Sequence, residues 1–169
     1  ELMPNKTVKV DAYFRTSDEN IYAVGDCATV TNRETGQPAW SPMGSSANIE
    51  GRLLAKTLAG GGQPYPGALP TAVCRPPGLH AGRTGLSQEQ AKAAGYDPIS
   101  VVTVVDDKAH YYPGAGNFIV KMTADRATGK FLGIQVLGPG AVDKMVDIAV
   151  TALTLKASLA DLENMDLAC

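Results

Sequence analysis

The chain has 169 residues, 44% of them hydrophobic and 19% charged, a composition typical of a folded α/β or α+β protein. Its 15 Lys and Arg residues are balanced by 17 Asp and Glu residues, so charge gives no indication of binding to nucleic acid or to an anionic membrane. No apolar stretch approaches the roughly 20 residues that a membrane-spanning helix needs.

The cysteines and histidines do not form a recognisable site. Cys27, Cys74 and Cys169 form no C-x-x-C pair, so we expect no redox disulfide within the chain. Free thiols favour a cytoplasmic location. His80 and His110 do not lie at ligand spacing from one another or from the cysteines, and we expect no metal site. The start of the chain lacks Met and the features of a signal peptide, which indicates a piece of a longer protein.

The first part of the chain has the pattern of an α/β unit. Alternation over residues 8–13 predicts a half-buried strand. The apolar run 21–24 predicts a strand buried on both faces, which ends at Gly25 and Asp26. Residues 30–44 are rich in loop-forming types, and residues 45–59 predict a helix. Its apolar face would consist of Ala47, Gly51, Leu54, Ala55 and Leu58, with Gly60 as a left-handed cap.

The segment 60–70, GGGQPYPGALP, is the clearest boundary in the chain. Beyond it, residues 87–90 resemble a capping box that begins a short helix. The run 99–105 is dense in β-branched residues and predicts a strand.

Two further strands are predicted at 118–122 and 131–136. The short link between them contains Asp125 and Gly129, residue types that a hairpin turn favours, so the two strands should be antiparallel. A long apolar helix is predicted over 141–157, followed by another helical turn at 159–163.

Gly25 and Asp26 carry the most specific chemical signal. Glycine allows a ligand to approach the backbone closely, and a carboxylate at the end of a strand can accept a hydrogen bond from a polyol hydroxyl. A Gly-Asp pair on its own favours the simpler interpretation, an Asp that only caps an ordinary strand.

The longer string T-S-x-x-N-I-Y-A-V-G-D-C at 16–27 closely resembles the second flavin-binding motif of flavoprotein reductases with two dinucleotide-binding domains. This resemblance implies that Asp26 hydrogen-bonds the ribityl chain of FAD and that Gly25 permits the close approach. The segment 42–52, P-M-G-S-S-A-N-I-E-G-R, resembles the family pattern P-L-A-x-x-A-N-x-x-G-R at the start of the following helix. It implies additional flavin contacts from Gly44, Ser45, Ser46 and Ala47.

Later motifs, at 84–87, 111–114, 128–129 and 133–135, resemble the dimerisation domain of one branch of this family. That branch contains coenzyme A–disulfide reductases, NADH oxidases and NADH peroxidases. The resemblance implies a homodimer and makes Tyr111 and Tyr112 candidate substrate-side residues, with a purely structural role as the alternative. The segment 74–80 departs from the branch, and no site residue is assigned there.

The family's nucleophilic cysteine and its G-x-G-x-x-G loops do not occur in this sequence, so we assign no catalytic residue. We therefore expect an α+β chain in which 1–62 is the C-terminal portion of a Rossmann-like FAD-binding domain, 63–70 a linker and 71–169 a dimerisation domain. The parent enzyme would pass hydride from NADH or NADPH through FAD to a disulfide, peroxide or oxygen. This chain alone should bind no FAD tightly. The alternatives are a non-catalytic dimerisation module and a small α+β binding domain.

Overall fold

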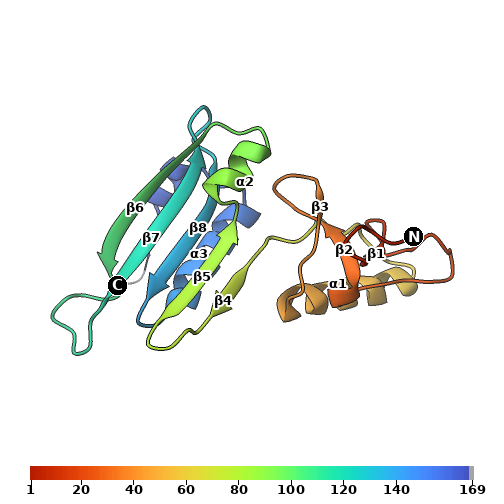
Figure 1. The fold of residues 1–169 in the computed structure, drawn as a ribbon, viewed down its shortest axis with the longest axis horizontal. Coiled ribbons are helices and arrows are strands. Elements are labelled where there is room, and N and C mark those ends of the chain that lie inside the picture. Colours follow the sequence, from red (N-terminus) through yellow and green to blue (C-terminus); the bar gives the residue numbers. More distant parts are fainter. Residues whose placement is uncertain (168–169) are drawn as a thin grey trace. The chain divides into compact units, whose positions relative to one another are not determined.

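The structure, a computed structural model, describes residues 1–167 and divides into two compact units, Glu1–Leu69 and Pro70–Cys169 (Figure 1). Cys169 lies outside the described residues. The division falls at the end of the segment rich in Gly and Pro.

The first unit contains a small sheet and one long helix. Its strands occur in the order β1-β2-β3, with β1 parallel to β2 and β2 antiparallel to β3. A single turn of 3₁₀ helix, η1, directly precedes β2. The elements are β1 (Val8–Lys9), η1 (Gly25–Cys27), β2 (Ala28–Thr31), β3 (Pro38–Ala39) and α1 (Gly44–Leu58).

The interior of this unit mixes a few apolar side chains with hydrogen-bonded polar ones. Phe14 is 1% exposed and its ring lies 5.5 Å from that of Tyr65. The hydroxyls of Thr7 and Thr29 are buried and bonded to each other. Loops rather than strands therefore supply much of the packing.

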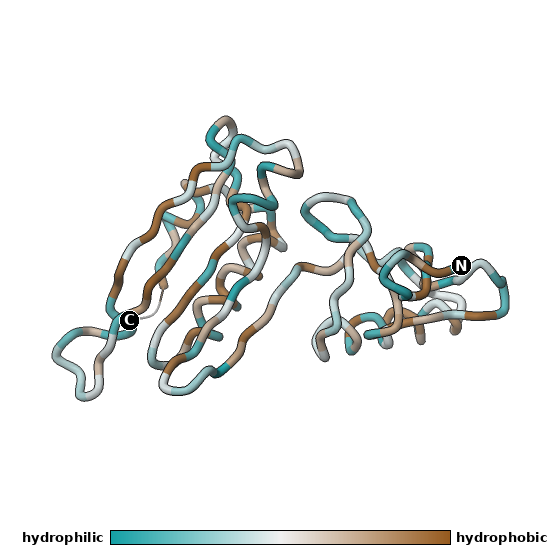
Figure 2. Tube along the Cα trace, in the orientation of Figure 1, coloured by the Kyte–Doolittle hydropathy of each residue, from teal (hydrophilic) through white to brown (hydrophobic). Residues whose placement is uncertain are grey.

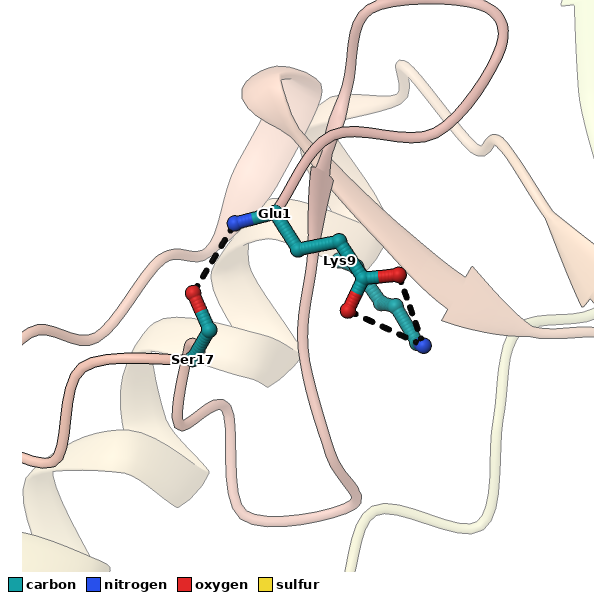
Figure 3. A network of polar contacts seen from close by, with 3 residues as sticks. All are labelled: Glu1, Lys9 and Ser17. Carbon is teal, nitrogen blue, oxygen red and sulfur yellow. Dashed lines mark hydrogen bonds and ion pairs between the residues drawn. The ribbon is translucent and has the colours of Figure 1, made fainter.

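At the surface, the N-terminal residue is tied to two segments (Figure 3). The ammonium group of Glu1 donates to Ser17 Oγ at 2.9 Å, and the Glu1 carboxylate pairs with Lys9 Nζ at 3.1 Å. Both charged side chains of the ion pair are more than half exposed, so the pair contributes little to stability.

The prediction of a strand at 21–24 is wrong. These residues form only one isolated bridge, between Tyr22 and Arg15, and Ile21 is 55% exposed. The regular strand in this region is β2, which follows the Gly-Asp pair, so Asp26 lies before a strand and not at the exit of one. The strand predicted at 8–13 is limited to β1, because the chain turns after it and Phe14 adopts a left-handed backbone with φ +67°.

Helix α1 begins and ends within one residue of its predicted bounds, and Gly60 has the predicted left-handed conformation, with φ +84°. The predicted apolar face is wrong. The buried residues of α1 are Ser46 and Glu50, whereas Leu58 is 63% exposed. Both inward-facing side chains are hydrogen-bonded, Ser46 to Ser41 and Glu50 to the Gly25 N–H.

The second unit is a five-stranded antiparallel sheet with strand order β4-β5-β8-β7-β6 (Figure 1). Helix α3 packs against β5 and β8, and α2 contacts β6. The elements are β4 (Ala72–Cys74), β5 (His80–Gly85), α2 (Gln88–Ala93), β6 (Pro98–Asp106), β7 (Asn117–Asp125), β8 (Phe131–Gly138), α3 (Val142–Thr154) and α4 (Leu159–Glu163).

An apolar core fills the space between this sheet and α3. Apolar residues run along β6, β7, β8 and α3 (Figure 2). Gly82 permits the close approach of α3, since a Cβ there would lie 2.7 Å from a methyl carbon of Val146. The buried residues of the sheet and helix include Phe118, Val120, Phe131, Leu132, Ile134, Val136, Val142, Val146, Ala149 and Leu153.

Most predictions for this unit are confirmed. The α+β class, the antiparallel β7–β8 pair and the capping box at Ser87 are all present. Helix α3 is shorter than predicted, because Lys156 adopts a left-handed backbone with φ +58° and so ends the helical path. Strands β4 and β5 were not predicted. Pro76 and Pro77 lie in the turn between them and do not interrupt either strand.

Candidate functional site

The Gly25-Asp26 turn lies against the first turn of α1. Gly25 has φ +77°, a conformation that L side chains rarely adopt. A Cβ on Gly25 would lie 3.6 Å from the Cβ of Ala47, so the turn and the helix are in van der Waals contact. The structure thus brings together two segments that the sequence motifs place about twenty residues apart.

Two side chains hold this turn, and neither was singled out from the sequence. Glu50 on α1 accepts a hydrogen bond from the Gly25 N–H, at 2.7 Å to Oε2. Trp40 donates from Nε1 to the main-chain oxygen of Asp26, at 2.9 Å. Glu50 lies one helical turn beyond Ser46, on the same side of α1, so an inward-facing helix position was the available signal. No sequence signal pointed to Trp40.

The carboxylate of Asp26 remains available. Asp26 is exposed, and its main-chain oxygen is engaged by Trp40, but no hydrogen bond within residues 1–167 involves its side chain. An ionised carboxylate only accepts hydrogen bonds, so this group can receive hydroxyl donors from a ligand.

The four candidate residues at the start of α1 differ in their surroundings. Gly44 and Ser45 are exposed, whereas Ser46 is buried and its Oγ lies 2.8 Å from that of Ser41. Ala47 faces the Gly25 turn. The residue before the helix, Met43, provides no side-chain cap, in contrast to the capping boxes that begin α2 and α4. The first N–H groups of α1 are therefore not capped by a side chain.

Burial and charge shift the pKa values of two acid groups in the first unit, Glu50 and Tyr65. Burial raises the pKa of the Glu50 carboxyl, the Gly25 N–H lowers it, and the nearby charge of Asp26 raises it. Burial, followed by the charge of Glu50, raises the pKa of Tyr65 to about 12, while Arg33 acts in the opposite direction. These residues form one electrostatically connected group.

Tyr111 and Tyr112 lie in the second unit, in the connection between β6 and β7. They are 76% and 57% exposed, and their rings lie 5.5 Å apart. The His110 ring stands edge-on to Tyr111, at 5.8 Å. The connection thus presents an aromatic cluster to solvent.

Within residues 1–167, no group of three or more His, Cys, Asp or Glu side chains could hold a metal ion. Cys27 and Cys74 are free and exposed. None of the helices in the described part of the chain is long and apolar enough to cross a bilayer.

Comparison with known proteins decides the family. Residues 71–167 match the family described as "Pyridine nucleotide-disulphide oxidoreductase, dimerisation domain". The match includes the whole five-stranded sheet from β4 onward and helices α2 to α4. The chain belongs to the pyridine nucleotide-disulphide oxidoreductases.

Several members of this oxidoreductase family are similar over nearly the whole chain. A protein named "NAD(P)H sulfur oxidoreductase (CoA-dependent)" from Pyrococcus furiosus is 32% identical, over 91% of this chain and 35% of its own length. An "NADH oxidase" from Methanocaldococcus jannaschii is 32% identical, over 94% of this chain and 35% of its own length. The solved structure of an NAD-dependent persulfide reductase from A. fulgidus has a TM-score of 0.93 and 35% identity, over 99% of this chain and 31% of that one. The chain therefore spans about a third of the length of these relatives.

Proposed function

We propose that this chain is part of a flavoprotein oxidoreductase that passes hydride from NAD(P)H through FAD to a disulfide, peroxide or oxygen. Its own contribution would be the contact with the FAD ribityl chain and the dimer interface. The observation that carries this proposal is the Gly25-Asp26 turn, with its free carboxylate beside the start of α1. Names of relatives such as "NADH oxidase" and "Coenzyme A disulfide reductase" support an oxidoreductase and disfavour a purely non-catalytic module.

The residues present fit FAD. Its ribityl chain bears hydroxyl groups, which the Asp26 carboxylate can accept, and Gly25 has no side chain to obstruct the ligand. The uncapped start of α1, with Gly44 and Ser45 exposed, offers N–H groups and the positive end of the helix dipole to an electron-rich ring edge. FAD supplies the hydride-accepting chemistry when bound, and these residues would bind and orient it.

The domain organisation we propose is the one expected from the sequence. Residues 1–62 would be the C-terminal portion of the FAD-binding domain, 63–70 a linker and 71–169 the dimerisation domain. The separation of the chain near residue 70 supports the last boundary. Free Cys27 and Cys74 support a cytoplasmic location.

The decisive experiment replaces Asp26 by Asn or Ala in the full-length protein. A hydrogen bond to a charged group contributes about 1.5–3 kcal/mol, so FAD affinity should fall roughly ten- to a hundredfold. Flavin absorbance of the purified protein and titration of the apoprotein with FAD would measure the loss. Glu19→Gln is the matched control, because Glu19 is an exposed carboxylate in the same unit. Unchanged FAD affinity in the Asp26 variants would contradict the proposed role.

The homodimer is proposed from the family match and from the open apolar surface of the second unit. Val101, Val102 and Val104 on the edge strand β6 are each more than 60% exposed, and Ile148 on α3 is only half-buried. Sedimentation of residues 1–169 at micromolar concentration should give twice the monomer mass. The same preparation should be colourless, since this chain lacks a G-x-G-x-x-G loop for the FAD diphosphate.

Tyr111 and Tyr112 are proposed as substrate-side residues. Their exposure at the tip of a loop leaves both hydroxyls and rings accessible. Replacing each tyrosine by Phe in the full-length enzyme should raise KM for the electron acceptor and leave flavin reduction by NAD(P)H unchanged.

A further inference from the structure

Glu50 combines nearly complete burial with a bond to the proposed flavin-contact turn. Its side chain is 1% exposed, although it carries an ionisable carboxyl. Burying such a group costs free energy unless it is hydrogen-bonded. The Glu50 carboxylate accepts a hydrogen bond from the N–H of Gly25, at 2.7 Å. Gly25 lies twenty-five positions earlier in the chain.

The hydrogen bond to Glu50 fixes the backbone of Gly25, the residue directly before Asp26. Gly25 can adopt many backbone conformations, yet here it has φ +77°. Glu50 holds its N–H on one side, and Trp40 holds the main-chain oxygen of Asp26 on the other. With both ends of this dipeptide held, the direction in which the Asp26 side chain leaves the backbone is set.

We propose that Glu50 is a positioning residue for flavin binding, whose carboxylate oxygen fixes the Gly25 amide and so aims the Asp26 carboxylate at the ribityl hydroxyls. This inference rests on the proposed function of Asp26. Glu50 itself is buried beneath the turn and would not touch the flavin. Its effect depends on the reach of its side chain, because a carboxylate one methylene shorter would withdraw from the Gly25 N–H.

Two near-isosteric variants separate reach from charge in the full-length protein. Glu50→Gln keeps the reach and an acceptor oxygen but removes the charge. Glu50→Asp keeps the charge but shortens the side chain. Positioning predicts that Glu50→Gln binds FAD within about threefold of wild type, because its amide oxygen still accepts from the Gly25 N–H. Glu50→Asp should lose about tenfold or more, the size of one hydrogen bond between FAD and a misaimed Asp26 carboxylate. The absorbance and visible circular dichroism of the bound flavin should change in Glu50→Asp and should match those of wild type in Glu50→Gln.

A control variant accounts for general loss of stability. Thr7→Val removes a buried hydrogen bond in the same unit, between the hydroxyls of Thr7 and Thr29, neither of which bonds to Gly25, Asp26 or Glu50. It should lower the thermal unfolding midpoint without altering FAD affinity or the flavin spectrum.

The outcomes distinguish this inference from the function on which it rests. Wild-type affinity in Glu50→Asp, together with flavin loss in Asp26→Ala, would overturn the role of Glu50 and leave the role of Asp26 intact. Strong flavin loss in Glu50→Gln, with wild-type behaviour in Glu50→Asp, would also overturn it, since charge rather than reach would then matter. Flavin retention in Asp26→Ala would overturn the proposed function itself.

Discussion

The two units of this chain have interiors of different kinds. Of the buried hydrophobic residues in the described chain, the first unit contributes only Phe14, Ala28, Val30 and Ala68, and all the others belong to the second unit. More of the buried polar residues lie in the first unit than in the second. Thr7, Thr29, Ser41, Ser46 and Glu50 lie in the first unit, against Thr84, Thr123 and Asp125 in the second.

The two kinds of interior contribute different properties, stability in the second unit and fixed geometry in the first. Apolar burial stabilises a fold without depending on exact partners, and the sheet and α3 of the second unit provide it. Buried hydrogen bonds contribute less net stability but fix geometry, because an unpaired partner is costly. The proposed flavin-contact turn lies in the unit whose interior is polar. Precise placement of a backbone turn is thus linked to Glu50 and Trp40, and bulk stability to the second unit.

The largest expected effect tests the apolar core of the second unit. Leu153→Ala should lower the free energy of unfolding by about 2–5 kcal/mol, because Leu153 is 1% exposed and its removal leaves a cavity. Leu155→Ala is the matched control and should change it by less than about 0.5 kcal/mol, since Leu155 is 73% exposed. Urea denaturation followed by circular dichroism measures both.

The same titration can also test whether the units are separate. Trp40 is the only tryptophan in the sequence and lies in the first unit, so its fluorescence reports on that unit. We expect Leu153→Ala to leave the fluorescence transition in place. A transition that moved with the substitution would show that the two units unfold together.

A smaller effect is expected where backbone atoms pack against glycine. Gly85→Ala places a Cβ 2.3 Å from the main-chain oxygen of Leu132, at a residue with φ +71°. Neither the strand nor the carbonyl can move easily, so the loss should be about 3 kcal/mol. Gly129→Ala has a similar φ, +69°, but open space around it, and should cost only about 1 kcal/mol. Equal losses in the two variants, measured by thermal unfolding, would show that steric contact is unimportant at Gly85.

The second unit was the more predictable from sequence, for physical reasons. Its strands β6, β7 and β8 carry runs of β-branched and aromatic residues, and its helix α3 has a continuous apolar stripe. Such patterns reflect apolar burial, which is what sequence periodicity detects. Strand β5 escaped prediction because its sequence, HAGRTG, has almost no apolar side chains and its glycines serve close packing.

The first unit was less predictable, because its structure depends on individual contacts. The apolar run at 21–24 indicated a buried strand, but no strand in the described residues pairs with it along its length. The motif identified Gly25 and Asp26 as a pair, yet the residues that hold them come from α1 and from the loop before it. Trp40 belongs to no periodic pattern, and the one sequence signal for Glu50 is its position one helical turn beyond Ser46. The partners of both side chains, the Gly25 N–H and the main-chain oxygen of Asp26, follow only from the three-dimensional path of the chain.

The smallest expected effect tests whether the polar interior of the first unit responds to pH. Burial raises the pKa of Glu50 above its ordinary value of 4.5, so the folded unit holds this proton more tightly than the unfolded chain does. The contribution of Glu50 to stability should therefore be fully present below pH 4.5 and be lost as the pH rises through the raised pKa. Asp26 strengthens this trend by charge repulsion, and the Gly25 N–H opposes it. Unfolding followed by Trp40 fluorescence should show the decline in wild type and in Glu19→Gln, but not in Glu50→Gln. A decline that persisted in Glu50→Gln would assign the pH dependence to another group.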